Sequence, residues 1–124
     1  RDVVMRPGEP HPFKHALSIR ATVVSDAQTG FVVTDAGLKE VDNLNGKINA
    51  DILSGAPDGA IYSLIGDDMG RIDFAREGDK MSVGDAVELM PPHCYMPPHM
   101  FSHYHVVRGD QLVDIWPITA RDSW

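Results

Sequence analysis

The stretch from Met90 to Trp116 concentrates the side chains of this chain that can bind a metal ion or transfer a proton. It contains four of the six histidines, the single cysteine and four of the nine prolines. Imidazole nitrogens and a thiolate sulfur are ligands that suit Zn²⁺. The sequence therefore predicts a metal site in this stretch, with zinc as the first choice and four candidate ligands, His93, His99, His103 and His105.

The spacing of the last two histidines suggests how such a site would form. A strand is expected over 103–107, and alternate residues of a strand share a face, so His103 and His105 would lie together with Tyr104 opposite. A third ligand from the proline-rich loop, His93 or His99, would leave one open coordination position. The alternative is that these histidines only hydrogen-bond to their neighbours, because their spacing matches no closed-site pattern such as paired C-x-x-C motifs.

Three other groups could carry chemistry, and each has a simpler interpretation. Cys94 would be a nucleophile beside a histidine, but a buried, inert thiol is the favoured interpretation. Asp67 and Asp68 lie in a glycine-flanked stretch, where aspartate favours turns by bonding to its own backbone. Lys39 follows a glycine and is interpreted as a solvated surface residue.

Charge and composition exclude several classes of function. The formal net charge of −7 argues against nucleic acids and anionic membranes as partners, because both require a basic surface. There is no apolar run long enough to span a bilayer, no secretory signal and no phosphate-binding glycine loop. A single cysteine cannot form an internal disulfide, so a cytoplasmic location is the expectation.

The elements expected to position these residues are strands. Apolar residues alternate with polar ones from Leu17 to Val23, which is typical of a half-buried strand within 15–25. Further strands are predicted over 31–34, 60–65, 71–75, 86–90, 103–107 and 111–118. Residues 42–59 are predicted to form a long loop, with a short helical turn near 48–53.

This pattern predicts an all-β fold, a small β-barrel of about seven strands. No segment shows the 3.6-residue period of a long amphipathic helix. We expect residues 1–12, which contain three prolines, to form an extended N-terminal arm. Residues 13–124 are expected to form a single β-barrel domain.

Four sequence blocks, taken in order, resemble the C-terminal β-domain of D-threonine aldolases and D-serine dehydratase-like proteins. The resemblance covers the chain from about Phe13 to Ala120. The blocks are V-V-T-D-A-G-L-K (32–39), G-D-D-M-G-R-I (66–72), V-G-D-A-V-E-L-M-P-P-H-C (83–94) and Y-H-V-V-R-G-D-Q-L-V-D-I-W-P-I (104–118). The resemblance implies a β-barrel like the C-terminal domain of alanine-racemase-type enzymes. It also implies an N-terminal barrel domain that carries pyridoxal phosphate on a lysine.

The resemblance implies a divalent metal site, from which this sequence departs in part. His93 occupies the position of the family's first metal ligand. The second ligand, usually Asp or Cys, falls on Tyr95, whose phenol must lose a proton before it can bind zinc. His99 falls where the family has an asparagine, and Met69 falls where a turn histidine is common.

Two functions follow as expectations. The first is that the chain is a stand-alone or fragmentary domain of a pyridoxal-phosphate-dependent lyase (an aldolase or dehydratase). It would not be catalytic alone, because the cofactor requires a separate barrel domain of roughly 200 residues or more. The second is a non-catalytic, oligomeric β-domain that binds a small ligand or a divalent metal. The expected partner is accordingly a second copy of the chain or the missing N-terminal barrel domain.

Overall fold

Eight strands and two short helices make up the fold. The computed structural model describes residues 14–43, 46 and 49–119. The elements are β1 (Ile19–Ser25), β2 (Phe31–Thr34), α1 (Leu38–Val41), β3 (Asp51–Ser54), β4 (Ile61–Leu64), β5 (Gly70–Asp73), β6 (Ala86–Met90), α2 (Pro97–Met100), β7 (His103–Arg108) and β8 (Gln111–Pro117). The predicted arm over 1–12 lies outside the described residues.

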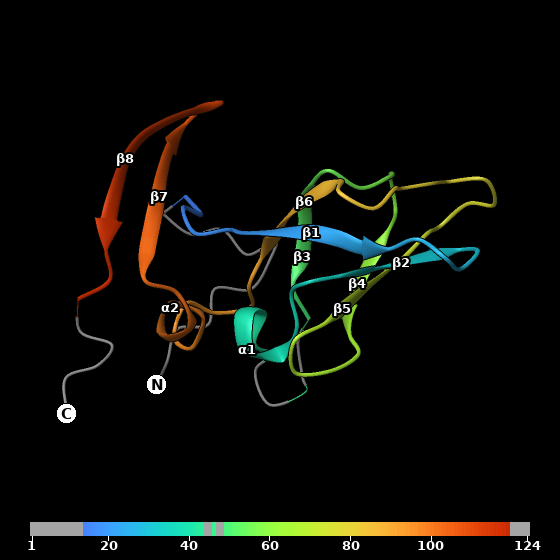
Figure 1. The fold of residues 1–124 in the computed structure, drawn as a ribbon, viewed down its shortest axis with the longest axis horizontal. Coiled ribbons are helices and arrows are strands. Elements are labelled where there is room, and N and C mark those ends of the chain that lie inside the picture. The colour runs from blue at the N-terminus through green and yellow to red at the C-terminus, as the bar shows by residue number, and fades with distance from the viewer. Residues whose placement is uncertain (1–13, 44–45, 47–48, 120–124) are drawn as a thin grey trace.

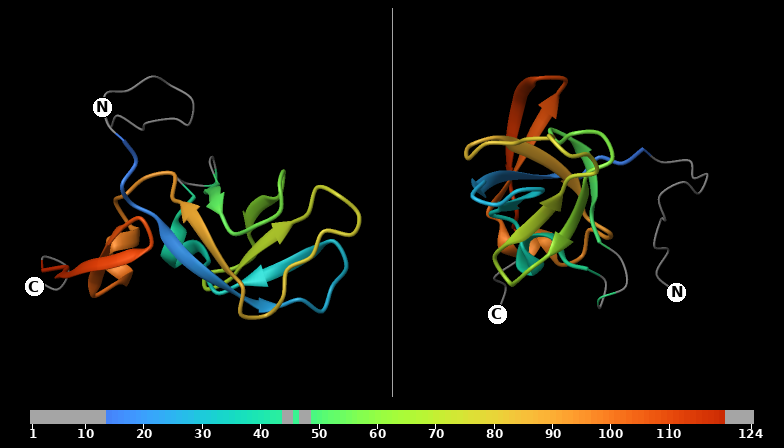
Figure 2. Two further views of the ribbon diagram at one scale, coloured as in Figure 1. Left: turned by 90° about the horizontal axis from the view of Figure 1, so that it is seen from above. Right: turned by 90° about the vertical axis from the view of Figure 1, so that its right-hand side faces the viewer.

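Six of the strands form one antiparallel sheet in the order β3-β6-β1-β2-β5-β4. The sheet curls so that its two edge strands, β3 and β4, approach each other, which gives a nearly closed barrel (Figures 1 and 2). Inward side chains alternate with outward ones along β1, β2, β5 and β6, as the period of two requires. In β1, for example, Ile19, Ala21 and Val23 are buried while Arg20 is exposed. The all-β barrel predicted from the sequence is therefore confirmed.

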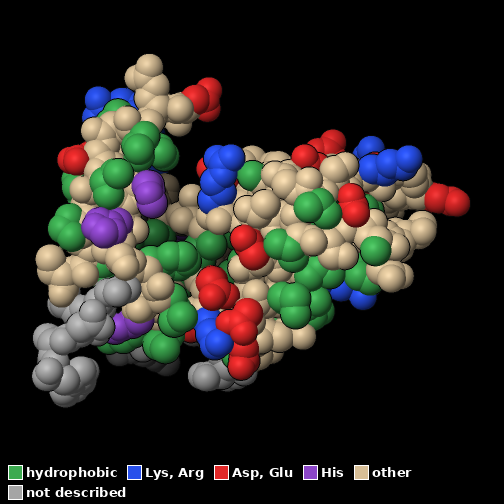
Figure 3. All heavy atoms as spheres, viewed as in Figure 1, with side chains coloured by type: hydrophobic (Ala, Val, Ile, Leu, Met, Phe, Trp, Pro, Cys, Tyr) green, Lys and Arg blue, Asp and Glu red, His purple; other side chains and the backbone are tan. Residues whose placement is uncertain are grey.

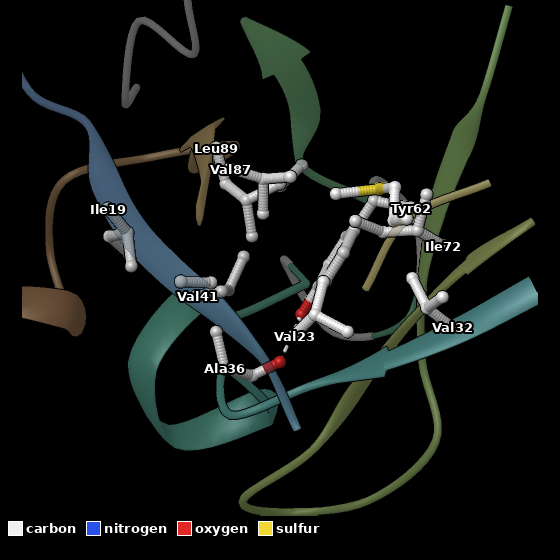
Figure 4. Close-up of a cluster of buried hydrophobic side chains, with 12 residues drawn as sticks. Ile19, Val23, Val32, Ala36, Val41, Tyr62, Ile72, Val87 and Leu89 are labelled. Atoms are coloured by element: carbon white, nitrogen blue, oxygen red, sulfur yellow. Dashed lines mark hydrogen bonds between the residues drawn. The ribbon is translucent and has the colours of Figure 1, made fainter. Parts of the chain in front are cut away.

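The core fills the inside of this barrel and has Tyr62 at its centre (Figure 4). The other buried apolar side chains are Ile19, Ala21, Val23, Val32, Ala36, Val41, Ala50, Ile72, Met81, Val87 and Leu89. The Tyr62 hydroxyl donates a hydrogen bond of 2.8 Å to the backbone carbonyl of Ala36. Burial, with a smaller contribution from the charge of Glu40, raises the pKa of Tyr62 well above its ordinary range. The phenol therefore stays neutral and serves as a structural donor.

The loop predicted over 42–59 is wrong in one respect, because it contains strand β3. This strand pairs with β6, with Asp51 opposite Met90 and Ile52 opposite Leu89. Its side chains are mostly exposed, so no alternation of apolar residues marked it in the sequence. The helical turn predicted near 48–53 is wrong for the same reason, since residues from Asp51 onward are extended.

The two helices were not predicted, and each is a single turn. The amide of Gly37, just before α1, donates a 2.9 Å hydrogen bond to the carboxylate of Glu40. Pro97 and Pro98 begin α2, where the first turn of a helix tolerates the missing amide hydrogen of proline. Segments of four residues are too short to produce a helical period in the sequence.

Strands β7 and β8 form a separate hairpin beside the barrel (Figure 1). They pair antiparallel from His103 opposite Pro117 to Arg108 opposite Gln111. Neither strand hydrogen-bonds to the six-stranded sheet. The last predicted hairpin is therefore confirmed as an element, but it stands apart from the barrel.

Candidate functional site

His93 lies in the loop that follows β6 and pairs with the carboxylate of Asp42, at the end of α1. The two atoms, Nε2 of His93 and Oδ2 of Asp42, are 3.0 Å apart. The side chains are 22% and 16% accessible, so the pair is largely shielded from water. The other imidazole nitrogen, Nδ1, accepts a 3.0 Å hydrogen bond from the backbone N–H of Tyr95. Both nitrogens of His93 are thus engaged within the chain.

Asp42 holds this position in an unusual backbone conformation. Its φ is 60° and its ψ is 165°, and it is the one non-glycine residue with positive φ in the part of the chain that the structure describes. This region of the φ/ψ map is close to glycine-only and costs on the order of 1–3 kcal/mol for other residues. Strain of this kind persists where the surroundings fix it, and here the His93 pair and a 2.9 Å bond from the Asp42 amide to the Leu38 carbonyl do so.

The helix that presents Asp42 is fixed in turn by the stretch 66–69. The amides of Leu38 and Lys39 donate hydrogen bonds of 3.1 and 3.0 Å to the carbonyls of Gly66 and Asp67. A side chain at Gly37 would place its Cβ 2.3 Å from the backbone nitrogen of Met69, so only glycine permits this close approach. Two of the sequence blocks that carry the family resemblance therefore meet in space, and their joint role is to position α1.

Lys39 and Asp68 form an exposed ion pair across the same contact. Nζ of Lys39 lies 2.7 Å from Oδ1 of Asp68. This hydrogen bond, together with the negative charge of Asp68, raises the pKa of Lys39. The interpretation of Lys39 as merely solvated is therefore corrected: it is exposed, but it is paired with a residue of the neighbouring turn. The same pair gives Asp68 a partner within the chain.

The other predicted ligands lie on elements further along the chain. His99 is on α2, while His103 and His105 are on β7, and all three are exposed. The prediction that His103 and His105 share a face is confirmed, since they alternate with the half-buried Tyr104. Across the described ranges, no three His, Cys, Asp or Glu side chains gather as a metal-binding group. The assignment of the four histidines as ligands therefore stays a prediction.

The residues next to His93 also bear on a metal site. Cys94 is exposed, so the expected buried thiol is wrong: the loop turns it toward solvent. Tyr95 is 76% exposed, and its ring contacts that of His93 edge-on, with centroids 6.1 Å apart. A metal at His93 would need a free lone pair on the imidazole and a second donor at Tyr95. Because both nitrogens of His93 are engaged and position 95 holds a tyrosine where the resemblance implies Asp or Cys, this arrangement does not fit a metal ion.

A cavity of about 540 Å³ lies at a different place, between the β1–β2 turn and the segment 74–82. Val32 and Met81, both buried, contribute to its wall, and Asp79 and Lys80 also line it. None of the predicted ligands lines this cavity. It is therefore separate from the His93–Asp42 pair.

The sequence identified His93 but missed Asp42. These residues are far apart in the chain, and Asp42 opened a stretch interpreted only as a loop. A positive φ at an aspartate leaves no signature in a single sequence. The arrangement at the site is a half-buried, hydrogen-bonded imidazole–carboxylate pair, which holds the imidazole in one orientation.

Among the described residues, no helix is long and apolar enough to cross a membrane.

Comparison with known sequences places the chain in a family. Residues 16–107 match the family described as "Putative serine dehydratase domain". The chain is 30% identical over 112 residues to a D-threonine aldolase of Arthrobacter sp, covering 90% of this chain and 28% of that protein. It is 29% identical over 114 residues to a 3-hydroxy-D-aspartate aldolase of Paracoccus denitrificans, covering 88% and 27%.

Solved structures show the same relationship. The crystal structure of D-threonine aldolase from Filomicrobium marinum superimposes with a TM-score of 0.76 at 25% identity, covering 94% of this chain and 31% of that one. The D-threo-3-hydroxyaspartate dehydratase from Delftia sp. HT23 shares the fold, with a TM-score of 0.58 at 20% identity over 81% of this chain and 31% of that one. The chain thus spans under a third of the length of these relatives. The chain belongs to the serine dehydratase domain family, as a counterpart of its C-terminal domain.

Proposed function

We propose that this chain is the β-domain of a pyridoxal-phosphate-dependent lyase that cleaves or dehydrates D-3-hydroxy amino acids. In this proposal it works with a barrel domain that supplies the cofactor. The observation that carries the proposal is the match of nearly the whole chain to less than a third of a D-threonine aldolase. A domain of this size, whose sequence has no phosphate-binding glycine loop, can form only one part of such an enzyme.

The contribution of this chain to the reaction is the imidazole of His93. Pyridoxal phosphate, when bound by the barrel domain, supplies the electron sink for the carbanion of the amino acid. Asp42 accepts a hydrogen bond from Nε2 of His93, and the Tyr95 amide donates one to Nδ1, so the ring is held in one orientation and one tautomer. Contact of this ring with a polar group of a bound substrate would require one of these two hydrogen bonds to be exchanged.

In this proposal the chain alone does not turn over substrate, because the electron sink is the pyridoxal phosphate that the barrel domain binds. Lys39 is held in a surface ion pair with Asp68 and is unsuited to form a Schiff base. The partner required for activity is therefore the barrel domain. A cytoplasmic location is part of the proposal, in keeping with the single, exposed thiol of Cys94.

A second candidate function is a non-catalytic, oligomeric β-domain that binds a small ligand or a divalent metal. Tyr95 favours it, because the resemblance implies a metal ligand, Asp or Cys, at this position. The engagement of both His93 nitrogens favours the small-ligand form of this candidate, since a metal ion would need one of them. On this account the catalytic role has been lost and the fold has been kept.

A fusion protein separates the two candidates. The segment of the Arthrobacter D-threonine aldolase that matches this chain would be replaced by the chain, and the chain alone would be assayed beside it. Both proteins receive pyridoxal phosphate and D-threonine, and release of the carbonyl product is measured. The first candidate predicts release by the fusion protein and only the free-cofactor rate from the chain alone. A folded, cofactor-loaded fusion protein without activity favours the second candidate.

A further inference from the structure

We infer that Asp42 takes the place of a metal ion in holding His93, so that this domain fixes its imidazole without a metal. A carboxylate beside a histidine is common in metal sites, where it accepts a hydrogen bond from the ring nitrogen that does not touch the metal. Which nitrogen of His93 remains for a metal therefore decides between the two kinds of site. This binding property belongs to the chain itself, whether or not the proposed reaction takes place.

Neither ring nitrogen of His93 remains for a metal ion. Nε2 lies 3.0 Å from Oδ2 of Asp42, so this nitrogen carries the ring proton and donates it to the carboxylate. In a metal site of the common kind, the ion would then bind the other nitrogen, Nδ1. Nδ1 accepts a 3.0 Å hydrogen bond from the backbone N–H of Tyr95, in the same loop as His93. A metal ion would have to displace one of these two partners.

The carboxylate of Asp42 is engaged on both of its oxygens. Oδ1 accepts a 2.5 Å hydrogen bond from the amide of Asn43, while Oδ2 faces His93. The 3.0 Å between Nε2 and Oδ2 is the length of a direct N–H···O bond. Two ligands of one tetrahedral zinc ion, each about 2.0–2.2 Å from the ion, would lie roughly 3.4 Å apart. The backbone bond from Asp42 to Leu38 keeps the carboxylate close to the ring.

No further donor completes a metal site around this pair. Zinc sites use three or four protein ligands, and over residues 14–43, 46 and 49–119 no three His, Cys, Asp or Glu side chains gather. Tyr95, where the resemblance implies Asp or Cys, is 76% exposed. On the face shown in Figure 3, histidine side chains lie at the hairpin end of the molecule, whereas most acidic side chains lie over the barrel. The exposed histidines on this face are thus not backed by a cluster of carboxylates.

Asp42 is therefore a positioning residue for His93. It fixes the ring through a hydrogen bond, as a metal ion would fix it through coordination. The two differ in charge, because the carboxylate places a negative charge beside the ring where an ion would place a positive one. In the proposed enzyme this domain would contribute a hydrogen-bonded imidazole and no Lewis acid, a consequence that rests on the proposed function.

Zinc titrations of the full chain test the role of Asp42. The wild type and its variants would be freed of metal with a chelator, and Zn²⁺ binding would be measured by isothermal titration calorimetry. The double variant Asp42→Gly/Tyr95→Asp removes the carboxylate beside Nε2 and introduces the ligand that the resemblance implies at position 95. Glycine suits the backbone of Asp42, whose φ is 60°, so this substitution relieves strain.

The matched control is Asp68→Ala/Tyr95→Asp. It has the same formal charge as the first double variant, because each loses one aspartate and gains another, but it keeps Asp42. Asp68 lies in the exposed pair with Lys39, away from His93. Circular dichroism would show that all variants keep the fold.

We expect His93→Ala to leave Zn²⁺ binding by the otherwise wild-type chain unchanged within about twofold, because His93 offers the ion no lone pair. Asp42→Gly/Tyr95→Asp should bind Zn²⁺ at least about tenfold more tightly than the wild type, since the ring is then held at one nitrogen only and can turn toward an ion. Adding His93→Ala to this double variant should abolish the gain. Asp68→Ala/Tyr95→Asp should gain less than about threefold, because Asp42 still occupies Nε2.

Three results would overturn the inference. The first is a wild-type Zn²⁺ site that His93→Ala abolishes, since His93 would then be a ligand despite its two hydrogen bonds. The second is an equal gain in affinity from the two double variants, which would mean that Asp42 does not keep the ion out. The third is a folded Asp42→Gly/Tyr95→Asp variant that binds Zn²⁺ no more tightly than the wild type.

Discussion

At the scale of residues, the pair of His93 and Asp42 determines how the site is interpreted. The sequence drew attention to His93 because it lies in a cluster of histidines after two prolines. It gave no reason to connect His93 with Asp42, since a long stretch of chain separates them and the contact depends on how α1 packs. Which carboxylate lies beside a histidine depends on how distant segments pack in the folded protein. A single sequence therefore does not reveal it.

The pair should contribute measurably to stability. Replacing Asp42 with asparagine keeps the shape of the side chain but removes its negative charge, so the bond to His93 loses its charge-assisted character. We expect Asp42→Asn to lower the free energy of unfolding by about 1 kcal/mol, measured by urea denaturation. The control is Asp68→Asn, which weakens the exposed pair with Lys39 and should change it by less than about 0.5 kcal/mol. Equal changes in the free energy of unfolding for the two substitutions would mean that the Asp42–His93 contact stabilises the fold no more than the exposed Lys39–Asp68 pair does.

Tyr62 predicts a dependence of stability on pH. Burial raises its pKa in the folded state above the ordinary value of 10.0. Above that value the unfolded chain loses the phenolic proton while the folded chain keeps it, so the unfolded state binds fewer protons and stability falls as pH rises. Tyr62→Phe should remove this part of the alkaline loss, and at neutral pH it should cost about 1 kcal/mol for the lost bond to Ala36. Parallel denaturation series at pH 8 to 11 (about the range in which phenols ionise) would measure both effects. An unchanged alkaline slope in Tyr62→Phe would contradict this account.

At the scale of elements, the contact between α1 and the stretch 66–69 is the feature that positions the site. The sequence does not reveal why position 37 is a glycine; the reason is the close approach of another backbone. It predicted most strands correctly. In β1 and β2, for example, residues that face the barrel core alternate with residues that face outward, and this alternation is visible in the sequence. It missed β3, since that strand is held by its ladder to β6 and has mostly exposed side chains.

This contact can be tested with two glycines. A Cβ at Gly37 would lie 2.3 Å from the Met69 nitrogen and 2.6 Å from the Asp67 carbonyl oxygen, whereas a Cβ at Gly66 would meet nothing within 4 Å. Backbone atoms cannot move aside as a side chain can, so we expect Gly37→Ala to destabilise the fold by roughly 1–3 kcal/mol. Gly66→Ala should change stability by less than about 1 kcal/mol. Thermal unfolding of both variants is the measurement, and a stable Gly37→Ala variant would show that α1 does not depend on this contact.

At the scale of the whole molecule, a nearly closed barrel carries a hairpin that stands beside it. The sequence predicted both parts, but it did not predict that the hairpin would stay outside the sheet. Alternation of residue types reports which side chains of a strand share a face; it does not report what lies against that face. All seven residues of β8 are exposed, and the chain covers 28% of the D-threonine aldolase of Arthrobacter sp that it matches.

The measurement that tests the account most directly is the rate of carbonyl release from D-threonine by the aldolase fusion protein, relative to the chain alone. The account predicts that the fusion protein, once it is loaded with pyridoxal phosphate, releases product at least tenfold faster than free cofactor, while the chain alone does not exceed the free-cofactor rate. Clear turnover by the chain alone would contradict the need for a barrel domain. A correctly folded and cofactor-loaded fusion protein that releases no product would contradict the assignment of this chain as the β-domain of such a lyase.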